Sequence, residues 1–419
     1  MRPWYRQIDW VLILAWAGLV AVSLVAIYST THGRGAEYLP GTMRENTERQ
    51  AFFFLASIVA LLVCLTRSPR FFHNLAWPAY LLGLALITAT AAIGEERNGA
   101  KAWLALGGVG FQPAELAKLG TVMAVASLLA GRNPKGKSLR YAIGAVVLLL
   151  IPAAITIAGQ NDTGTGLVFL GLIPIVLFWS GLPLHILALM LAPAVAGYFA
   201  VVLKPAAYAF ALLFTFGIWI ATRQKSLAIV AATFTLGVTV AATLAIGFLQ
   251  PHQQARIVSF TNPEAEQFKD NVGYHLVQSK AAIGSGGLTG KGFMQGTQTQ
   301  GAYIPEQSTD FVFSIIGEEW GFLGSLVVLG LYGLLLGRLV KLGAQMRSPF
   351  GSLVAAGAAG VFLIHLFINL GMVTGLLPVI GIPLPFMSYG GTALLANSLM
   401  LAIVFSMHMR RDDFSVYGL

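Results

Sequence analysis

The stretch Trp10–Ser29, "WVLILAWAGLVAVSLVAIYS", contains no charged residue. A helix needs about 17 to 25 mostly apolar residues to cross the hydrocarbon core of a bilayer. The run is long for the apolar part of a signal peptide, and no small-residue cleavage site follows it. The stretch therefore predicts a retained first transmembrane helix.

The rest of the chain has the same apolar character. Hydrophobic residues make up 56% of the 419 positions and charged residues only 10%, and the mean hydropathy is +0.75. A soluble domain carries about 25% charged residues. We therefore expect an all-α polytopic membrane protein in which residues 1–419 form a single integral membrane domain. The one cysteine, Cys64, excludes a disulfide within the chain.

Hydropathy and loop charge together predict about twelve transmembrane helices with both termini cytoplasmic. We place them at residues 10–29, 51–66, 74–93, 113–130, 141–158, 166–181, 185–203, 206–222, 226–249, 311–337, 351–373 and 388–409. Between 166 and 249, four prolines interrupt an almost continuous apolar run, and the span boundaries are least defined there.

The formal net charge of +9 follows the positive-inside pattern of membrane proteins. Lys and Arg gather in short loops on alternate sides of the spans, which sets the orientation of the chain. These clusters are Arg2 and Arg6, Arg67 and Arg70, Arg132 to Arg140, Arg223 and Lys225, Arg338 to Arg347, and Arg410 and Arg411. The charge therefore does not indicate nucleic-acid binding.

Residues 250–309 form the only long polar stretch, and we expect a large extracytoplasmic loop there. Aromatic and aliphatic residues are interleaved throughout it, which disfavours disorder. Loops of this length in a compact bundle are usually functional when they are ordered.

This loop ends in "PEQSTDFVFSIIGEE", Pro305 to Glu319, which places three carboxylates close together. Asp310 precedes an apolar helix pattern, where a carboxylate can cap the helix or serve as a general base at the mouth of a cavity. Glu318 and Glu319 fall inside the expected span, where ionisable groups are costly. They are either a structural pair that anchors helices or members of the site.

Two further charged stretches point to the same side of the membrane. "FQPAELAKLG" sets Glu115 and Lys118 three residues apart on one helix face, as an ion pair or as a substrate contact. "GQNDTGTG" sets Asp162 at a helix end, either as a turn residue or as part of a polar cavity shared with Lys118 and Asp310.

External basic residues could bind a phosphate-bearing substrate or be solvated loop charges. They are Lys101, Arg256, Lys280 and Lys291. "GSGGLTGKG" departs from a nucleotide-binding P-loop because Ser285 and Gly292 stand where glycine and Ser/Thr are required. The sequence shows no zinc-type Cys/His spacing and no nucleophile elbow, so no protein metal site is predicted.

Several of these stretches together resemble the SEDS family, the shape, elongation, division and sporulation proteins (FtsW/RodA/SpoVE). They are "FQPAELAKL", "RIVSFTNP", "QSKAAIGSGGLTGKG", "PEQSTDFVFSIIGEEWGF" and "NLGMVTGLLPVIGIPLPFMSYGG". They occur in the family's order across nearly the whole chain, and the last favours the RodA branch. This chain departs from the family at Asn161–Thr165, at Lys101, where two arginines are common, and in an extra transmembrane hairpin at 205–249 added to a core of ten spans.

The resemblance implies a peptidoglycan glycosyltransferase that polymerises lipid II for cell elongation, on the outer face of the cytoplasmic membrane. It implies a class B penicillin-binding protein as transpeptidase partner, and lipid II, undecaprenyl-pyrophosphate-linked glycan and membrane lipids as ligands. Asp310 matches the family's essential loop aspartate, and Glu115, Lys118 and Asp162 match charged residues that line its central cavity. A divalent cation, Mg or Mn, would be held mainly by the substrate pyrophosphate.

Two other functions fit the same physics. A flippase for lipid-linked precursors would also use intramembrane charges and proline-broken helices, although no inverted repeat is visible. A purely structural scaffold for a penicillin-binding protein would explain neither the carboxylates nor Lys118.

Overall fold

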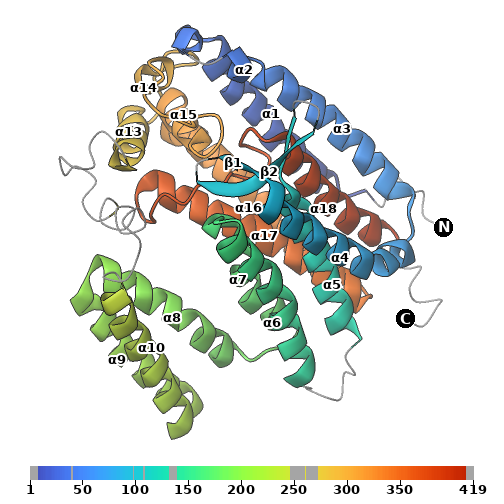
Figure 1. Ribbon diagram of the computed structural model, residues 1–419, viewed down its shortest axis with the longest axis vertical. Helices are drawn as coiled ribbons and strands as arrows, with labels where there is room; N and C mark the ends of the chain where they lie inside the picture. The colour runs from blue at the N-terminus through green and yellow to red at the C-terminus, as the bar shows by residue number, and fades with distance from the viewer. Residues whose placement is uncertain are drawn as a thin grey trace. The chain divides into compact units, whose positions relative to one another are not determined.

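The computed structural model describes residues 8–38, 41–97, 99–106, 109–131, 139–245, 260 and 272–411. Its helices follow the predicted spans closely (Figure 1). Eleven helices in this part of the chain are long and apolar enough to cross a membrane, and the shorter α7 (Thr163–Trp179) is also apolar. The predicted all-α polytopic membrane fold is therefore confirmed.

The long helices are built from uninterrupted apolar runs, and several begin at a capping residue. Asp9 and Ser68, for example, accept the backbone N–H groups of Leu12 and Phe71 with their side chains, as N-cap residues do. The long helices are α1 (Trp10–His32), α3 (Asn46–Thr66), α4 (Pro69–Ile93), α5 (Pro113–Ala130), α6 (Leu139–Ala154), α8 (Leu184–Val202), α9 (Lys204–Thr222), α10 (Lys225–Ala245), α16 (Gly321–Gln345), α17 (Pro349–Thr374) and α18 (Gly391–Met409).

Shorter elements lie between the long helices. They are η2 (Arg34–Tyr38), α2 (Gly41–Arg44), β1 (Glu95–Arg97), β2 (Ala100–Leu106), β3 (Val109–Phe111), the π-helical turn η3 (Ile155–Gly159), α13 (Val272–Ser285), α14 (Thr297–Gln300) and α15 (Val312–Glu319). The strands form one antiparallel sheet in the order β1-β2-β3, with Leu104 opposite Phe111. The sequence analysis did not anticipate these strands.

The chain divides into two compact units. Unit 1 contains the described residues within Met1–Val176, Gln278–Leu376 and Ile380–Leu419, and unit 2 contains those within Leu177–Val277 and Leu377–Val379. In unit 2, α8, α9 and α10 pack against one another. The predicted hairpin at 205–249 corresponds to α9 and α10, and its status as an insertion stays a prediction.

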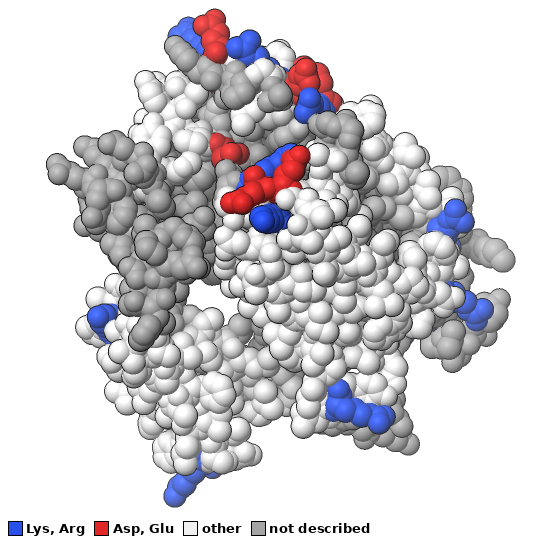
Figure 2. Space-filling model, in the orientation of Figure 1, with Lys and Arg blue, Asp and Glu red and all other residues white. Residues whose placement is uncertain are grey.

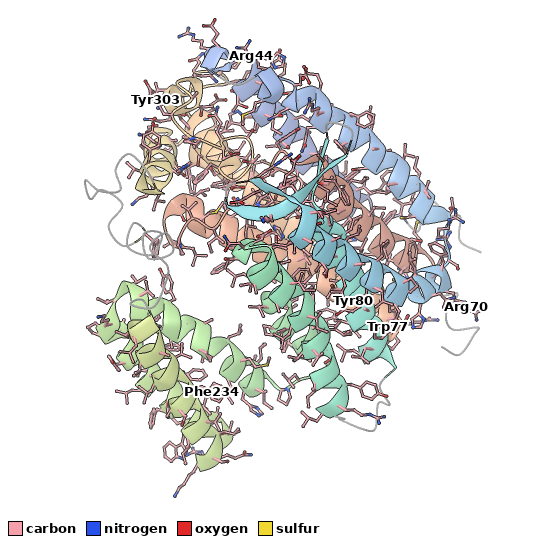
Figure 3. The ribbon with its side chains drawn as sticks, viewed as in Figure 1. Arg44, Arg70, Trp77, Tyr80, Phe234 and Tyr303 are labelled. Atoms are coloured by element: carbon pink, nitrogen blue, oxygen red, sulfur yellow. The ribbon has the colours of Figure 1, made fainter. Side chains whose placement is uncertain are left out.

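Unit 1 has α5, α17 and α18 at its centre. These three helices bury 72–78% of their most apolar window, against 17% for α3. Helix α5 packs on α4 and α17, while α18 packs on α3, and α16 packs on α1 and α17 (Figure 1). Figure 3 labels Arg44 and Tyr303 at one end of these helices and Arg70 at the other.

Proline inside a helix leaves a carbonyl without its partner, and α6 shows how the bundle compensates. Pro152 has no N–H, so the carbonyl of Leu148 loses its usual helical bond. Tyr80 of α4, labelled in Figure 3, donates its hydroxyl to that carbonyl at 3.1 Å. The hydroxyl of Thr156 in turn donates to the Pro152 carbonyl at 2.9 Å. Side chains thus satisfy the backbone where a bilayer would offer no partner.

The expected span 311–337 is two helices rather than one. Helix α15 ends at Glu319, and α16 begins at Gly321, which adopts φ +66°. A side chain at Gly321 would lie 2.3 Å from the backbone nitrogen of Gly290. The break therefore follows from a close backbone contact with the Gly287–Gly290 turn, which only glycine permits at this φ.

Candidate functional site

Asp310 lies in the turn that directly precedes α15. Three consecutive carbonyls of this turn are held by other parts of unit 1. The backbone N–H of Tyr389 donates to the Ser308 carbonyl at 2.7 Å, the Ser388 hydroxyl to the Thr309 carbonyl, and Asn369 Nδ2 to the Asp310 carbonyl at 2.8 Å. The backbone at Asp310 is therefore fixed from two sides.

Two of these donors, Ser388 and Tyr389, belong to the non-helical stretch Gly375–Gly390, which we call the clamp. The carbonyls of the clamp accept side chains from four helices. The donors are Asn369 to Ile382 at 2.7 Å, Ser23 to Met387 at 2.6 Å, Gln50 to Ser388 at 3.2 Å, and Tyr332 to Pro385. Irregular backbone among apolar helices is stable only when it is satisfied in this way. The predicted irregular segment is thus present as a loop.

The Asp310 carboxylate itself has no partner. Across the described residues, no hydrogen bond or ion pair involves its oxygens, and the side chain is partly exposed. Gly381 of the clamp lies beside it, because a Cβ at this glycine would sit 3.3 Å from Asp310 Oδ2. Loss of surrounding water raises the pKa of Asp310 to about 7, and repulsion from Glu306 and Asp162 adds to the rise.

Asp162 caps α7 at a position close enough to repel Asp310. Its carboxylate accepts the backbone N–H of Thr165 at 2.9 Å and the Thr165 hydroxyl at 2.7 Å. Gln112 Nε2 approaches it at 3.4 Å, and the preceding Asn161 has φ +56°. Asp162 thus ends a turn and lies close enough to Asp310 to repel its charge, while the polar cavity expected to be shared with Lys118 and Asp310 stays a prediction.

The environment of Lys118 is closed, whereas the sequence predicted an open charged cavity. Only 1% of its side chain is exposed, and Nζ lies 2.8 Å from Glu115 Oε1 and 2.8 Å from His365 Nε2. His365 Nδ1 lies 2.9 Å from the Pro383 carbonyl. Lys118 therefore reaches the Asp310 clamp through His365 and does not face open solvent.

Glu318 and Glu319 lie at the end of α15 and accept hydrogen bonds from the segment Lys291–Gln300 that precedes this helix. Glu318 accepts Lys291 Nζ, the backbone N–H groups of Gln298 and Thr299 at 2.8 Å each, and the Thr299 hydroxyl at 2.7 Å. Glu318 thus fastens α14 and Lys291 to α15.

Glu319 makes the corresponding contact with α1. Its oxygens accept the Ser29 hydroxyl at 2.7 Å and Gln300 Nε2 at 3.1 Å. Both glutamates therefore have a structural role, and Lys291 is engaged in an ion pair rather than left free.

Two of the remaining basic candidates, Lys101 and Lys280, are exposed. Lys101 is exposed on β2, and its backbone N–H donates to the Gln160 carbonyl at 2.8 Å, which ties the strand to the turn before Asp162. Figure 2 shows acidic and basic side chains together over β1 and β2, where Glu95, Glu96 and Arg97 are also exposed. Lys280 is exposed on α13. Arg256 lies outside the described residues.

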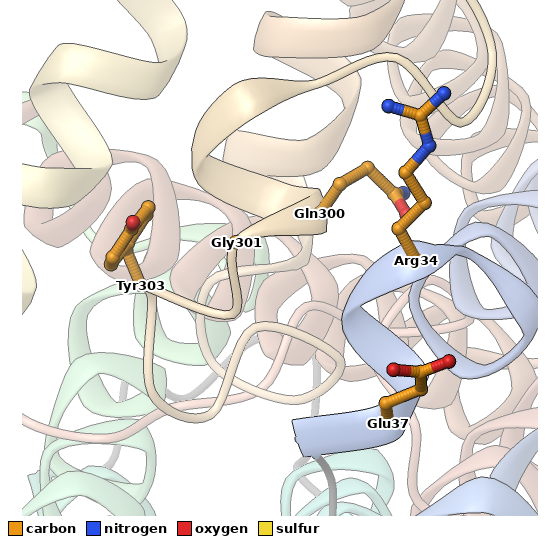
Figure 4. A pocket seen from close by; sticks show the side chains of 5 residues that line it. All are labelled: Arg34, Glu37, Gln300, Gly301 and Tyr303. Atoms are coloured by element: carbon orange, nitrogen blue, oxygen red, sulfur yellow. The ribbon is translucent and has the colours of Figure 1, made fainter.

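Two cavities flank the segment that leads to Asp310. The larger, of about 590 Å³, is lined by Arg34, Glu37, Gln300, Gly301 and Tyr303 (Figure 4). The smaller, of about 220 Å³, lies against Ala302 and Ile304 to Ser308. Neither is lined by Asp310, Asp162 or Lys118. Within the described part of the chain, no three His, Cys, Asp or Glu side chains are grouped so that they could hold a metal ion.

His365 and Asn369 were missed by the sequence analysis. Both are buried on α17, and their four-residue spacing puts them on one helix face. A polar or ionisable side chain inside an apolar span is expensive and marks a functional position. That rule applied to the span 351–373 would have found both residues.

The fold and the site define a polytopic membrane protein whose helices present a clamped acidic turn at one end. The family described as "Cell cycle protein", FtsW/RodA/SpoVE, matches residues 9–216 and 204–413. The chain belongs to this family, and the resemblance to SEDS proteins is confirmed.

Known relatives cover nearly the whole chain. The peptidoglycan glycosyltransferase MrdB of Escherichia coli K12 is 33% identical over 88% of this chain and 87% of its own length. A solved chain from a peptidoglycan synthase complex, described as coordinating polymerization and crosslinking, has a TM-score of 0.70 at 30% identity and covers 96% of this chain and 98% of that one. The rod shape-determining protein RodA of Thermus thermophilus has a TM-score of 0.62 at 29% identity, with 96% and 97% covered.

Proposed function

We propose that this chain is a peptidoglycan glycosyltransferase that polymerises lipid II on the outer face of the cytoplasmic membrane. The relative MrdB carries that enzyme name, and its alignment with this chain covers 87% of its own length. The single observation that carries the chemistry is the Asp310 carboxylate, which is fixed by its backbone and has no partner among the described residues. A general base needs this combination of fixed position and free lone pairs.

In the proposed reaction, the 4-hydroxyl of the acceptor GlcNAc attacks C1 of the lipid-linked MurNAc. Asp310 takes the hydroxyl proton while the bond from C1 to the pyrophosphate oxygen breaks. Undecaprenyl pyrophosphate leaves, and the anomeric centre inverts from α to β. A base with a pKa close to the working pH is efficient in such a step, and the pKa of Asp310 is about 7.

Charge on the leaving pyrophosphate must be neutralised. External Lys and Arg side chains such as Lys101 and Lys280 are exposed and available for this role. A divalent cation, Mg or Mn, would add Lewis-acid stabilisation and would depend on pyrophosphate oxygens for most of its ligands. The polyprenyl chains would lie between the helices, in contact with membrane lipids.

A class B penicillin-binding protein is the proposed transpeptidase partner. The solved synthase complex, whose chain resembles this one, couples polymerization to crosslinking. Both chain termini would be cytoplasmic, which is consistent with the basic clusters Arg2 and Arg6, and Arg410 and Arg411.

Polymerisation of lipid II by the purified chain in detergent, with and without its partner, tests the proposal. We expect Asp310→Asn to abolish polymerisation while its melting temperature stays at or above that of the wild type, because the change removes a poorly solvated charge. Full activity of this variant would remove Asp310 from the mechanism. A flippase would give no product without two compartments, so product formation by the wild type rules against that function.

A further inference from the structure

Gln307, three residues before Asp310, carries a buried amide without a hydrogen-bond partner. The residue is 5% exposed, and both Nε2 and Oε1 are buried and unpartnered among the described residues. A buried polar group left in this state is destabilising, because it has lost its water without gaining a replacement. The Gln307 amide could therefore gain hydrogen bonds from a bound molecule that the described residues do not provide.

Gln307 lines the smaller cavity beside the Asp310 turn, and so do other polar side chains. Asn46, at the start of α3, is also 5% exposed, and no hydrogen bond of its side chain occurs in the described structure. The polar lining residues are Thr30, Thr31, Asn46, Glu306, Gln307 and Ser308. Amides, hydroxyls and one carboxylate thus line the same cavity.

The lining predicts the chemistry of the ligand. The described lining residues include no Lys or Arg, and among them a phosphate or pyrophosphate would meet the negative charge of Glu306. Met43, Ile304 and Pro305 add apolar surface. Alternating hydroxyl-binding groups and apolar surface fit a neutral, polyhydroxylated ring that has polar edges and an apolar face.

The size of the cavity limits the ligand to one ring. Its volume of about 220 Å³ is below the roughly 300–1,000 Å³ of pockets that hold drug-sized molecules. A single pyranose fits this description, whereas a polyprenyl chain does not.

The cavity shares its wall with the Asp310 turn. Glu306 lines the cavity, accepts the Thr309 hydroxyl at 2.9 Å and lies close enough to Asp310 to repel its charge. A ring bound here would therefore be held beside the carboxylate that acts on the substrate hydroxyl.

We propose that this cavity is a sugar subsite, in which hydroxyl or acetamido groups of one substrate pyranose hydrogen-bond the Gln307 amide, with Asn46 as a second polar group of the lining. This inference rests on the proposed function for its substrate class. Gln307 acts here as a binding and positioning residue, and the proton transfer stays with Asp310.

The test uses Gln307→Met in the full-length chain with its partner, because methionine keeps the length of glutamine without its polar atoms. We expect the KM for lipid II to rise about tenfold while kcat changes less than threefold. The melting temperature of the ligand-free protein should stay the same or rise, because an unsatisfied buried amide has been removed. Asn46→Ala should raise KM in the same direction.

Gln298→Met is the matched control. Gln298 also has a buried, unpartnered Oε1, but it lines neither cavity, so its KM should equal that of the wild type. An unchanged KM in Gln307→Met, with an active wild type, would overturn the subsite and leave the proposed function standing. A lower melting temperature together with a lower kcat would also overturn it, because Gln307 would then support the fold.

Direct binding separates this inference from the reaction. We expect ligand-observed NMR to detect N-acetylglucosamine on the wild type and on Gln298→Met, and not on Gln307→Met. Gln307-dependent binding by a wild type that forms no polymer would support the subsite while the proposed reaction failed. Equal binding by all three proteins would sink the subsite.

Discussion

Asp310 is held in a state in which its own ionisation works against folding. Its surroundings disfavour the charged form, and Glu306 and Asp162 add negative potential, so the pKa rises from 3.8 to about 7. Between these two values the folded protein binds more protons than the unfolded chain. The contribution of Asp310 to the stability of the wild type therefore falls as the pH rises from about 4 to about 7.

This linkage gives a prediction for Asp310→Asn, which cannot ionise. We expect its melting temperature to exceed that of the wild type at pH 8, and the difference to shrink as the pH falls towards 4. Thermal unfolding of both proteins in one detergent across this range measures the effect. A difference that does not vary with pH would show that the Asp310 carboxylate is well solvated.

Lys118 shows why a loss of activity alone does not identify a catalytic residue. Its ammonium group is buried between Glu115 and His365, and removal of one partner leaves the other charge buried and unpaired, at about 3–5 kcal/mol. Substitutions at Lys118 will therefore destabilise the fold and disable the site together. Asp310, with no protein partner, lacks this ambiguity.

Helix α17 connects these two residues. It supplies His365 to Lys118 and Asn369 to the carbonyls of Asp310 and Ile382. The position of the clamp therefore depends on the orientation of the buried helix α17 as well as on the loop before α15.

Asn369→Ala tests this dependence. The change leaves two carbonyls without a donor, and each costs about 1–3 kcal/mol if it stays buried. We expect a lower melting temperature and a kcat that falls more than tenfold, with a smaller change in KM, because the position of Asp310 is lost before substrate binding is. Steady-state kinetics on lipid II and thermal unfolding measure both effects.

Thr374→Val on the same helix is the control for Asn369→Ala. The Thr374 hydroxyl donates to the Leu370 and Gly371 carbonyls of its own helix, at 2.7 Å and 3.4 Å, so its loss should leave kcat and stability nearly unchanged. A kcat in Asn369→Ala equal to that of the wild type would show that the clamp does not position Asp310.

The helices were predictable because an apolar run of fixed length is a local signal. The span 113–130 coincides with α5, and 10–29 falls short of α1 by only three residues. The break at Gly321 was not predictable, because it depends on a contact with Gly290, thirty-one positions earlier in the chain. The strands β1 to β3 were missed because they are short and are fixed in part by a non-local bond from Lys101 to Gln160.

The site was predictable only in part, for the same reason. The sequence placed Asp310, Asp162, Glu115 and Lys118 at external helix ends, and charge is visible without a structure. It could not show that Lys118 is buried, because burial depends on His365 from a distant helix. It also could not single out Gln307, since an unpartnered amide is visible only when every neighbouring donor and acceptor is placed.

Charge is distributed unevenly over the face shown in Figure 2. The visible Asp and Glu side chains gather near α2, β1 and β2, whereas Lys and Arg side chains are also visible away from these elements. Asp9, at the start of α1, adds little exposed negative charge, because it is buried in an ion pair with Arg338. Under the positive-inside rule, this asymmetry predicts that the acidic region is external.

Orientation can be measured with single cysteines in a Cys64→Ala background, because Cys64 is the only native thiol. Lys101 on β2 and Arg223 after α9 are both exposed, which makes them a matched pair for labelling. In spheroplasts we expect a membrane-impermeant maleimide to label Lys101→Cys, and to label Arg223→Cys only after the membrane is permeabilised. The reverse labelling pattern would invert every predicted loop. It would place Asp310 in the cytoplasm, away from an extracytoplasmic substrate.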